Sequence, residues 1–233
     1  MTALRLSIAL AAVTLAVQPL SAQSTPSART AAAKAAPAKA APAKAAPAKA
    51  AAAPTTWQID ATHSELTFRI RHLLGRVRGT FGDWSGTVVM DEATPSRSSV
   101  DVSIKTASID TQNEKRDEHL RSPDFFAADS FPAITFKSTN VAVTGKQLRI
   151  TGTLTMRGKS KPVVLTGEFG GQFKDPWGNM RTAFTASTKV NRMDYGVAFN
   201  SVVETGTMLG DDVTIEIAVE AVKQDAKQGT AGQ

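Results

Sequence analysis

The stretch that decides the fold lies near the C-terminus and reads Val213-Thr214-Ile215-Glu216-Ile217-Ala218-Val219-Glu220. Its large apolar side chains fall on every second residue, with Thr214, Glu216 and Glu220 on the opposite face. This period of two predicts a β-strand with one buried and one solvated face, which is typical of antiparallel sheets. The same alternation recurs over residues 66–71, 100–105, 148–156 and 163–169.

Turn signals separate these alternating segments. They are Thr144-Gly145, Arg157-Gly158-Lys159 and Asp175-Pro176-Trp177-Gly178. Proline and glycine occupy the second and fourth places of the last one, where β-turns favour them. The chain from Trp57 onward therefore holds about eight to ten strands in roughly 165 residues, which suits one β-sandwich or one closed barrel.

Two glycines fall on inward positions of predicted strands. Gly152 shares the face of Ile150 and Leu154, and Gly167 shares the face of Leu165. An inward glycine either bends a strand at a barrel corner or leaves room for a ligand. An eight-stranded barrel is just wide enough to be filled by side chains or to hold one small ligand, so both alternatives stay open.

One segment departs from the strand pattern. Thr111-Gln112-Asn113-Glu114 reads as a capping box, and residues 114–121 read as a helix that Ser122-Pro123 ends. Leu120 is its only strongly apolar residue, so the helix must lie on the surface or across one end of the sheet. Phe125 and Phe126 follow directly, and we expect them to plug the same end.

The positive charge is confined to the N-terminal segment. Six of the 27 Lys and Arg lie in residues 1–54, which hold no acidic residue; residues 55–233 then hold 21 basic and 21 acidic residues. A balanced domain argues against nucleic acid as a partner. The chain has no Cys, which excludes disulfides and thiolate ligands.

The N-terminal segment indicates secretion. Residues 1–22 have an early Arg5, an apolar run and small residues at the end, which predicts a signal peptide and a periplasmic protein. Residues 23–55 form an Ala/Pro/Lys-rich disordered spacer, in which lysine and proline recur every five residues. The spacer is either a soluble tether or a basic segment that binds anionic lipid. Residues 56–223 form the folded domain and residues 224–233 a disordered tail.

No catalytic motif is complete. Gly158-Lys159-Ser160 resembles the end of a phosphate-binding loop, but Thr153 stands where its first glycine belongs. His63, His72 and His119 form no spaced metal pair, although a barrel could bring the last two to one rim. We therefore predict no catalytic residue, no metal and no cofactor.

Five ordered motifs resemble the YceI-like family over about residues 56–222. They are Ile59-Asp60-Ala61-Thr62-His63-Ser64, Arg116-Asp117-Glu118-His119-Leu120-Arg121-Ser122-Pro123-Asp124-Phe125-Phe126, Phe131-Pro132-Ala133-Ile134-Thr135-Phe136, Gly152-Thr153-Leu154-Thr155-Met156-Arg157-Gly158 and Arg192-Met193-Asp194-Tyr195-Gly196. The resemblance implies an all-β fold: an eight-stranded, antiparallel, lipocalin-like barrel in the periplasm, whose hollow interior binds a polyisoprenoid or another long amphiphile. The short helix would then lie at the barrel end.

Strand parity, read together with this family fold, selects the candidate ligand-binding residues. The apolar lining would comprise Phe68, Ile70, Phe81, Ile104, Phe125, Phe126, Phe136, Leu154, Met156, Phe184 and Tyr195. Polar contacts at the mouth would come from His72, Asn113, Arg116, His119 and Arg192.

The leading hypothesis is a non-enzymatic periplasmic carrier that holds a polyisoprenoid or quinone-like lipid. Burial of apolar chain contributes about 0.8 kcal/mol for each methylene-sized group, which is ample for binding. Two alternatives stay open: an enzyme that uses the mouth histidines on a lipid-like substrate, and an envelope-tethered structural module with a filled barrel. Transient contact with a membrane surface and a homodimer are open as well.

Overall fold

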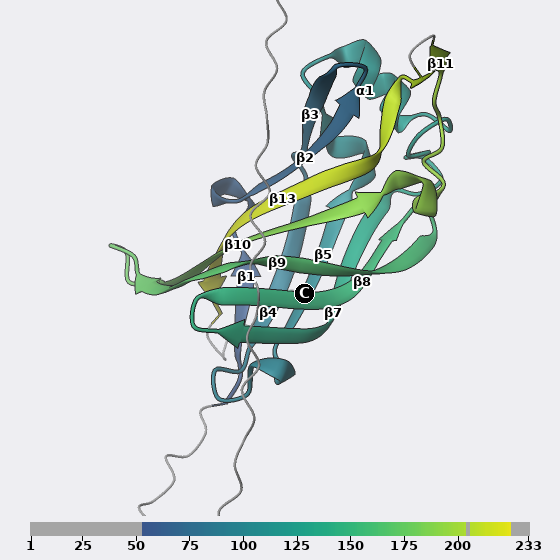
Figure 1. Cartoon of the computed structure of the whole chain (residues 1–233). Coiled ribbons are helices and arrows are strands. Elements are labelled where there is room, and N and C mark those ends of the chain that lie inside the picture. Colours follow the sequence, from purple (N-terminus) through teal and green to yellow (C-terminus); the bar gives the residue numbers. More distant parts are fainter. Residues whose placement is uncertain (1–52, 204–205, 225–233) are drawn as a thin grey trace, which may run out of the picture. The chain divides into compact units, whose positions relative to one another are not determined.

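The protein forms an antiparallel β-barrel of eight strands with one short α-helix, as a computed structural model shows (Figure 1). The structure describes residues 53–203 and 206–224. The strands of the barrel and of its extensions are β1 (Thr55–Ile59), β2 (Glu65–His72), β3 (Gly75–Phe81), β4 (Trp84–Met90), β5 (Ser99–Lys105), β6 (Ile109–Asp110), β7 (Ala133–Thr144), β8 (Gln147–Met156), β9 (Lys159–Lys174), β10 (Met180–Asn191) and β13 (Leu209–Lys223).

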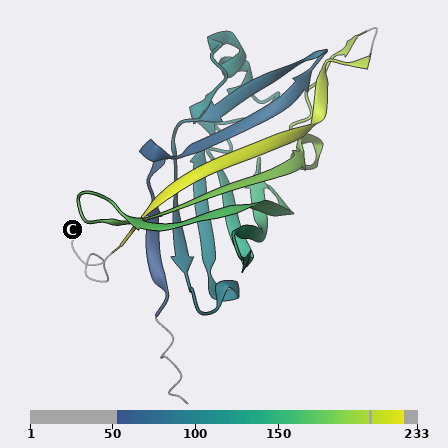
Figure 2. The same cartoon turned by 60° about the vertical axis from the view of Figure 1, so that its left-hand side comes forward.

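The barrel closes through its first and last strands. The ring runs β1-β4-β5-β7-β8-β9-β10-β13, and β13 returns to β1 with Trp57 opposite Lys223. The long β13 crosses the molecule in both views (Figures 1 and 2). Its other end pairs with β2, which continues the sheet through β3 and β6. One end is therefore a closed ring, and the other end opens into a flap of β2, β3 and β6.

The alternation seen in the sequence places apolar side chains on the inside of the barrel. Along β8, Leu148, Ile150, Leu154 and Met156 are buried, while Gln147 and Arg149 are exposed. The buried apolar side chains of all the barrel strands form one core cluster. The fold class predicted from the sequence is therefore confirmed, and closure into a barrel excludes the sandwich.

Helix α1 (Glu114–Arg121) has the predicted bounds, but its cap differs from the prediction. Asn113, not Thr111, is the N-cap, and its Oδ1 accepts a hydrogen bond from the Arg116 backbone nitrogen. Thr111 instead donates through its backbone nitrogen and Oγ1 to Oδ1 of the buried Asp117. The capping box was wrong because the sequence offers two cap residues, and the buried Asp117 engages the first.

A short hairpin and several one-turn helices complete the fold. The hairpin is formed by β11 (Val202–Val203) and β12 (Gly206–Thr207). The one-turn 3-10 helices are η1 (Ala61–His63), η2 (Pro95–Arg97), η3 (Thr106–Ser108) and η4 (Arg192–Tyr195). Helix α1, the β2–β3 hairpin and β11 lie at the same end of the barrel (Figures 1 and 2).

The predicted signal peptide, nearly all of the spacer and most of the tail lie outside the described residues. The strand β1 begins at Thr55, so the last spacer residue belongs to the barrel instead. Within residues 53–203 and 206–224, no helix has the length and apolar character that crossing a bilayer requires.

Candidate functional site: the barrel interior

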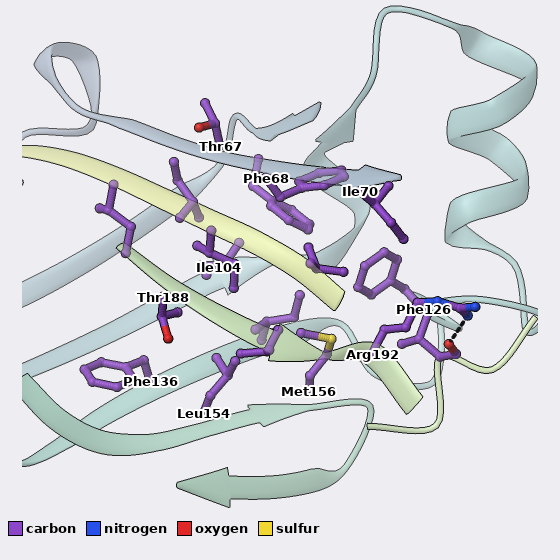
Figure 3. Close-up of a pocket in the computed structure, with 18 of the residues that line it drawn as sticks. Thr67, Phe68, Ile70, Ile104, Phe126, Phe136, Leu154, Met156, Thr188 and Arg192 are labelled. Atoms are coloured by element: carbon purple, nitrogen blue, oxygen red, sulfur yellow. Dashed lines mark hydrogen bonds between the residues drawn. The ribbon is translucent and has the colours of Figure 1, made fainter. Parts of the chain in front are cut away.

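The barrel is hollow, with a cavity of about 370 Å³ between the closed ring and helix α1. We call it the main cavity. Phe68 and Ile70 on β2 face Leu154 and Met156 on β8 across this space (Figure 3). Its wall consists almost entirely of apolar side chains, because each strand contributes its inward face. Such a space favours an apolar ligand of matching length and offers few groups for chemistry.

Most of the sequence-predicted site residues meet in this cavity. Those that line it are Phe68, Ile70, His72, Phe81, Ile104, Arg116, His119, Phe125, Phe126, Phe136, Leu154, Met156, Phe184 and Arg192. They come from six strands, α1, η4 and the loop after α1, so only the closed barrel brings them together. Whether they bind a ligand stays a prediction.

Tyr195 was predicted to line the cavity and does not, so its predicted placement was wrong. Asn113 was predicted at the mouth; it does not line the cavity either, and its contact with a ligand stays a prediction. Asn113 is exposed, and its side chain caps α1. Tyr195 is fully buried in η4, and its hydroxyl has no hydrogen-bond partner among the described residues. Burial, with a smaller effect of Asp194, raises the pKa of Tyr195 to about 12. Strand parity misplaced Tyr195 because the strand ends at Asn191 and a 3-10 turn follows.

The two inward glycines do not enlarge the cavity. A Cβ on Gly152 would lie 2.5 Å from Cζ of Phe136 and 2.5 Å from the Lys137 carbonyl oxygen, so the missing side chain makes room for a ring. A Cβ on Gly167 would lie 1.9 Å from the Thr185 carbonyl oxygen. Gly167 therefore permits a close approach of the β9 and β10 backbones and adds no space for a ligand.

An aromatic cluster forms one side of the cavity mouth. The His119 ring lies 5.0 Å from Phe125 and 4.9 Å from Phe199, measured between ring centroids, and both pairs are edge-to-face. Nε2 of His119 lies 3.0 Å from Oδ2 of Asp124. The imidazole is thus oriented by a carboxylate on one side and held by two phenyl rings on the other.

The side chains of the two arginines predicted at the mouth donate hydrogen bonds to other groups of the protein. Nη1 of the buried Arg192 donates to the carbonyls of Val197 (2.6 Å) and Phe199 (2.9 Å), and Nε donates to Gly210 (2.9 Å). Burial lowers the pKa of Arg192, and Asp211 opposes this. Arg116 donates to the Thr111 hydroxyl and carbonyl. Both arginines hold the mouth segments in place.

Sequence reasoning missed several lining residues. Phe199 lies in the loop after η4, where no periodicity marks an inward position. Val213, Ile215, Ile217 and Val219 on β13 were recognised as one strand face, and that signal was sufficient to place them inside. The remaining missed residues are Ile59, Leu66, Thr67, Val77, Trp84, Val100, Val102, Leu120, Ile134, Ile150, Val163, Leu165, Ala186, Thr188, Val190, Val197, Met208 and Leu209.

The chain is similar to known proteins over the whole barrel. Residues 57–221 match the model of the YceI-like domain. The chain is 41% identical over 176 residues to Protein YceI of Salmonella arizonae, covering 74% of this chain and 90% of that protein. The crystal structure of the Campylobacter jejuni YCEI protein is 36% identical, with a TM-score of 0.59, over 66% of this chain and 90% of that one.

Two more distant structures share the fold. Burkholderia cenocepacia BcnA is 22% identical, with a TM-score of 0.62, over 70% of this chain and 98% of that one. A polyisoprenoid binding domain from Saccharophagus degradans, implicated in plant cell wall breakdown, is 14% identical, with a TM-score of 0.54, over 73% and 99%. Together with the ordered motifs and the hollow barrel, the match over residues 57–221 establishes that this chain belongs to the YceI-like family.

Proposed function

We propose that the protein is a non-enzymatic carrier that shields a polyisoprenoid, or a similar long amphiphile such as a quinone, in the main cavity. The observation that carries the proposal is the almost wholly apolar interior with polar side chains gathered at its mouth. The fold that the chain shares with the polyisoprenoid binding domain from Saccharophagus degradans supports the ligand class. The predicted signal peptide supports a periplasmic carrier.

One observation favours the enzyme alternative. The His119–Asp124 pair at the mouth has the arrangement of a histidine base oriented by a carboxylate. His119→Ala separates the two functions. An enzyme would lose turnover and still retain its lipid, whereas a carrier would show altered retention and have no turnover to lose. The filled-barrel module has less support, because the interior contains a cavity.

The experiment that tests the carrier is mass spectrometry of an organic extract of protein purified from its native envelope. Phe68→Trp/Leu154→Trp places two indoles in the main cavity, and Arg149→Trp places one on the exposed outer face of β8. We expect a prenyl lipid with the wild type and Arg149→Trp and none with the double variant. A folded wild-type protein without stoichiometric lipid would overturn the proposal.

The carrier also needs a route to a membrane, and the β2–β3 hairpin is the proposed contact. Its tip has Leu73 and Leu74, of which Leu74 is fully exposed. Leu73 has a φ of 49°, a left-handed conformation that hairpin turns usually give to Asn or Gly. The exposed Arg71 and Arg76 flank the tip. Apolar residues flanked by arginines are suited to an anionic lipid surface.

Cosedimentation with vesicles tests this contact. We expect the wild type to bind vesicles with anionic lipid more strongly than purely zwitterionic ones, and Leu74→Asp to abolish the binding while the barrel stays folded. The same apolar tip would suit the interface of a homodimer. Sedimentation equilibrium distinguishes the two: a dimer that Leu74→Asp dissociates, without any vesicle binding by the wild type, would reject the membrane contact.

A further inference from the structure

Residues 122–130, which we call the strap, connect α1 with two walls of the cavity mouth. The Phe126 ring lies 6.0 Å from the Phe81 ring on β3, measured between centroids, and the pair is edge-to-face. The Phe125 ring lies 4.9 Å from the Phe199 ring in the loop after η4. All four rings line the main cavity. The two adjacent phenylalanines of the strap therefore join the flap to the loop after η4 at the mouth.

On one side, the strap is bonded to the end of α1. The backbone nitrogens of Phe126 and Ala128 donate to the carbonyls of Leu120 (3.0 Å) and Arg121 (2.8 Å). Nε of Arg121 in turn donates to the Ala107 carbonyl in η3 at 2.8 Å. This side of the strap is therefore fixed, because α1 is itself joined to η3.

On the other side, a single side chain holds the strap. Nη1 of Arg157, in the turn between β8 and β9, donates to the Phe125 carbonyl and, at 3.0 Å, to the Gly196 carbonyl at the end of η4. Within residues 53–203 and 206–224, no other hydrogen bond joins residues 123–129 to a group outside residues 113–131. Loss of the Arg157 contact would therefore leave this side of the strap attached by ring packing alone.

Arg157 has a backbone conformation that its own side chain disfavours. Its φ is 52°, and Gly158 follows with a φ of 71° in a two-residue turn between Met156 and Lys159. Such turns favour Asn-Gly, and a left-handed conformation is costly for arginine because Cβ crowds the carbonyl oxygen. Strain of this kind persists where the residue has another use. Here the contacts of the guanidinium with the strap and with η4 supply that use.

We propose that the strap is a gate, and that the amphiphile enters and leaves the main cavity when Arg157 releases the Phe125 carbonyl. This inference rests on the proposed carrier function and adds control of exchange to it. Phe125 and Phe126 then separate from Phe199 and Phe81, while the bonds to α1 stay in place. Arg157 is a positioning residue that stabilises the closed mouth with or without a ligand. It therefore slows entry and release alike and has little effect on affinity.

The first test needs no ligand. The chain has no cysteine, so Leu154→Cys places a single thiol on the wall of the main cavity. Arg157→Asn removes the contact with the strap and gives the turn its favoured Asn-Gly pair, so we expect the barrel to stay folded. Arg149→Asn removes the same charge from the exposed face of β8. N-ethylmaleimide should label the thiol about tenfold faster with Arg157→Asn and at an unchanged rate with Arg149→Asn.

The second test follows a ligand. Tritiated geranylgeraniol is bound to the protein, and its transfer to an excess of phosphatidylcholine vesicles is timed; loading from the vesicles is timed in the same way. We expect Arg157→Asn to accelerate release and loading by a similar factor, about tenfold, so that the Kd stays within about threefold of the wild type. Arg149→Asn should keep the wild-type rates.

Unchanged labelling and unchanged transfer in folded Arg157→Asn would overturn the gate and leave the carrier intact. Faster labelling with unchanged transfer would overturn it as well, because the ligand would then use another opening. A weaker Kd with an unchanged loading rate would place Arg157 in ligand binding and not in the gate. Failure of the wild type to bind geranylgeraniol would overturn the carrier, whereas the thiol labelling would still decide whether Arg157 keeps the mouth closed.

Discussion

Arg181 shows how single residues stabilise the closed end of the barrel. Its Nη1 lies 2.9 Å from Oδ2 of Asp60 and 3.1 Å from Oε2 of Glu220, and its Nε lies 3.0 Å from Oδ2 of Asp175. Burial by itself raises the pKa of Asp175, but hydrogen bonds from Asn179, Arg181 and the Trp177 backbone outweigh it and lower the pKa to about 2.

This cluster predicts that the folded protein loses stability as the pH falls. The Asp175 carboxyl titrates near 3.8 in the unfolded chain and near 2 in the folded protein, so the folded state binds fewer protons between these values. The stabilisation is complete above about pH 4 and is lost as the pH falls towards 2. The lowered pKa of Asp60 acts in the same direction.

We expect the thermal midpoint to fall over this pH range in calorimetry, and Asp175→Asn to reduce the dependence on pH. Asp129→Asn, which changes an exposed carboxylate outside the cluster, should keep the wild-type slope. An unaltered slope in Asp175→Asn would show that the cluster does not contribute.

Tyr195 supports a second prediction about a single residue. Its buried hydroxyl has no hydrogen-bond partner among the described residues. Folding therefore removes water from the hydroxyl without replacing the lost hydrogen bond, which lowers stability. We expect Tyr195→Phe to raise the free energy of unfolding by about 1 kcal/mol in urea titrations. Tyr195→Ala removes the packed ring and should lower it by about 3 kcal/mol or more. A loss of stability in Tyr195→Phe would reveal a hydrogen bond to the hydroxyl.

Among the elements, α1 is the one that has a polar surface and still lines the main cavity. Arg116, His119 and Leu120 reach the cavity from one side of the helix, while Asp117 is tied to Thr111. An eight-residue helix is too short to be stable alone, so its cap and these contacts hold it in place.

The cap of α1 therefore predicts a local effect. Asn113→Ala removes the side-chain acceptor of the Arg116 backbone nitrogen and should cost about 1 kcal/mol. We expect faster hydrogen exchange in α1 and unchanged exchange in β7 and β8. Lys115→Ala, on an exposed position of the same helix, should exchange as the wild type does.

At the scale of the whole barrel, the eight strands form a closed ring around a cavity. The eight strands of the ring pair with a neighbour on each side, including β13 with β1, and their inward side chains pack around the cavity. A ligand that binds the folded barrel and not the unfolded chain would add stability by mass action.

Removal of the bound ligand should lower the thermal stability of the whole barrel. For the carrier, we expect delipidated protein to keep its far-UV circular dichroism and to melt at a lower temperature. Added prenyl alcohol at about one hundred times its Kd should restore about 2.7 kcal/mol. Phe68→Trp/Leu154→Trp should show no such gain, and a gain equal to that of the wild type would place the ligand outside the main cavity.

The sequence by itself determined the strands, the inward faces and the span of α1, because side-chain alternation and helix punctuation are local properties. Val213, Ile215 and Ile217 could be assigned to one face without knowledge of any neighbour. The closed barrel and its lipid-binding interior were predicted from family resemblance, since alternation alone fits a sandwich equally well.

Only the tertiary structure decided which inward side chains leave space and which fill it. Gly152 gives its space to the Phe136 ring, Tyr195 turns away from the cavity, and Phe199 enters it from an irregular loop. Cavities depend on how side chains from six or more separate strands pack across the barrel, and that packing is set by strand register and closure, which are long-range properties.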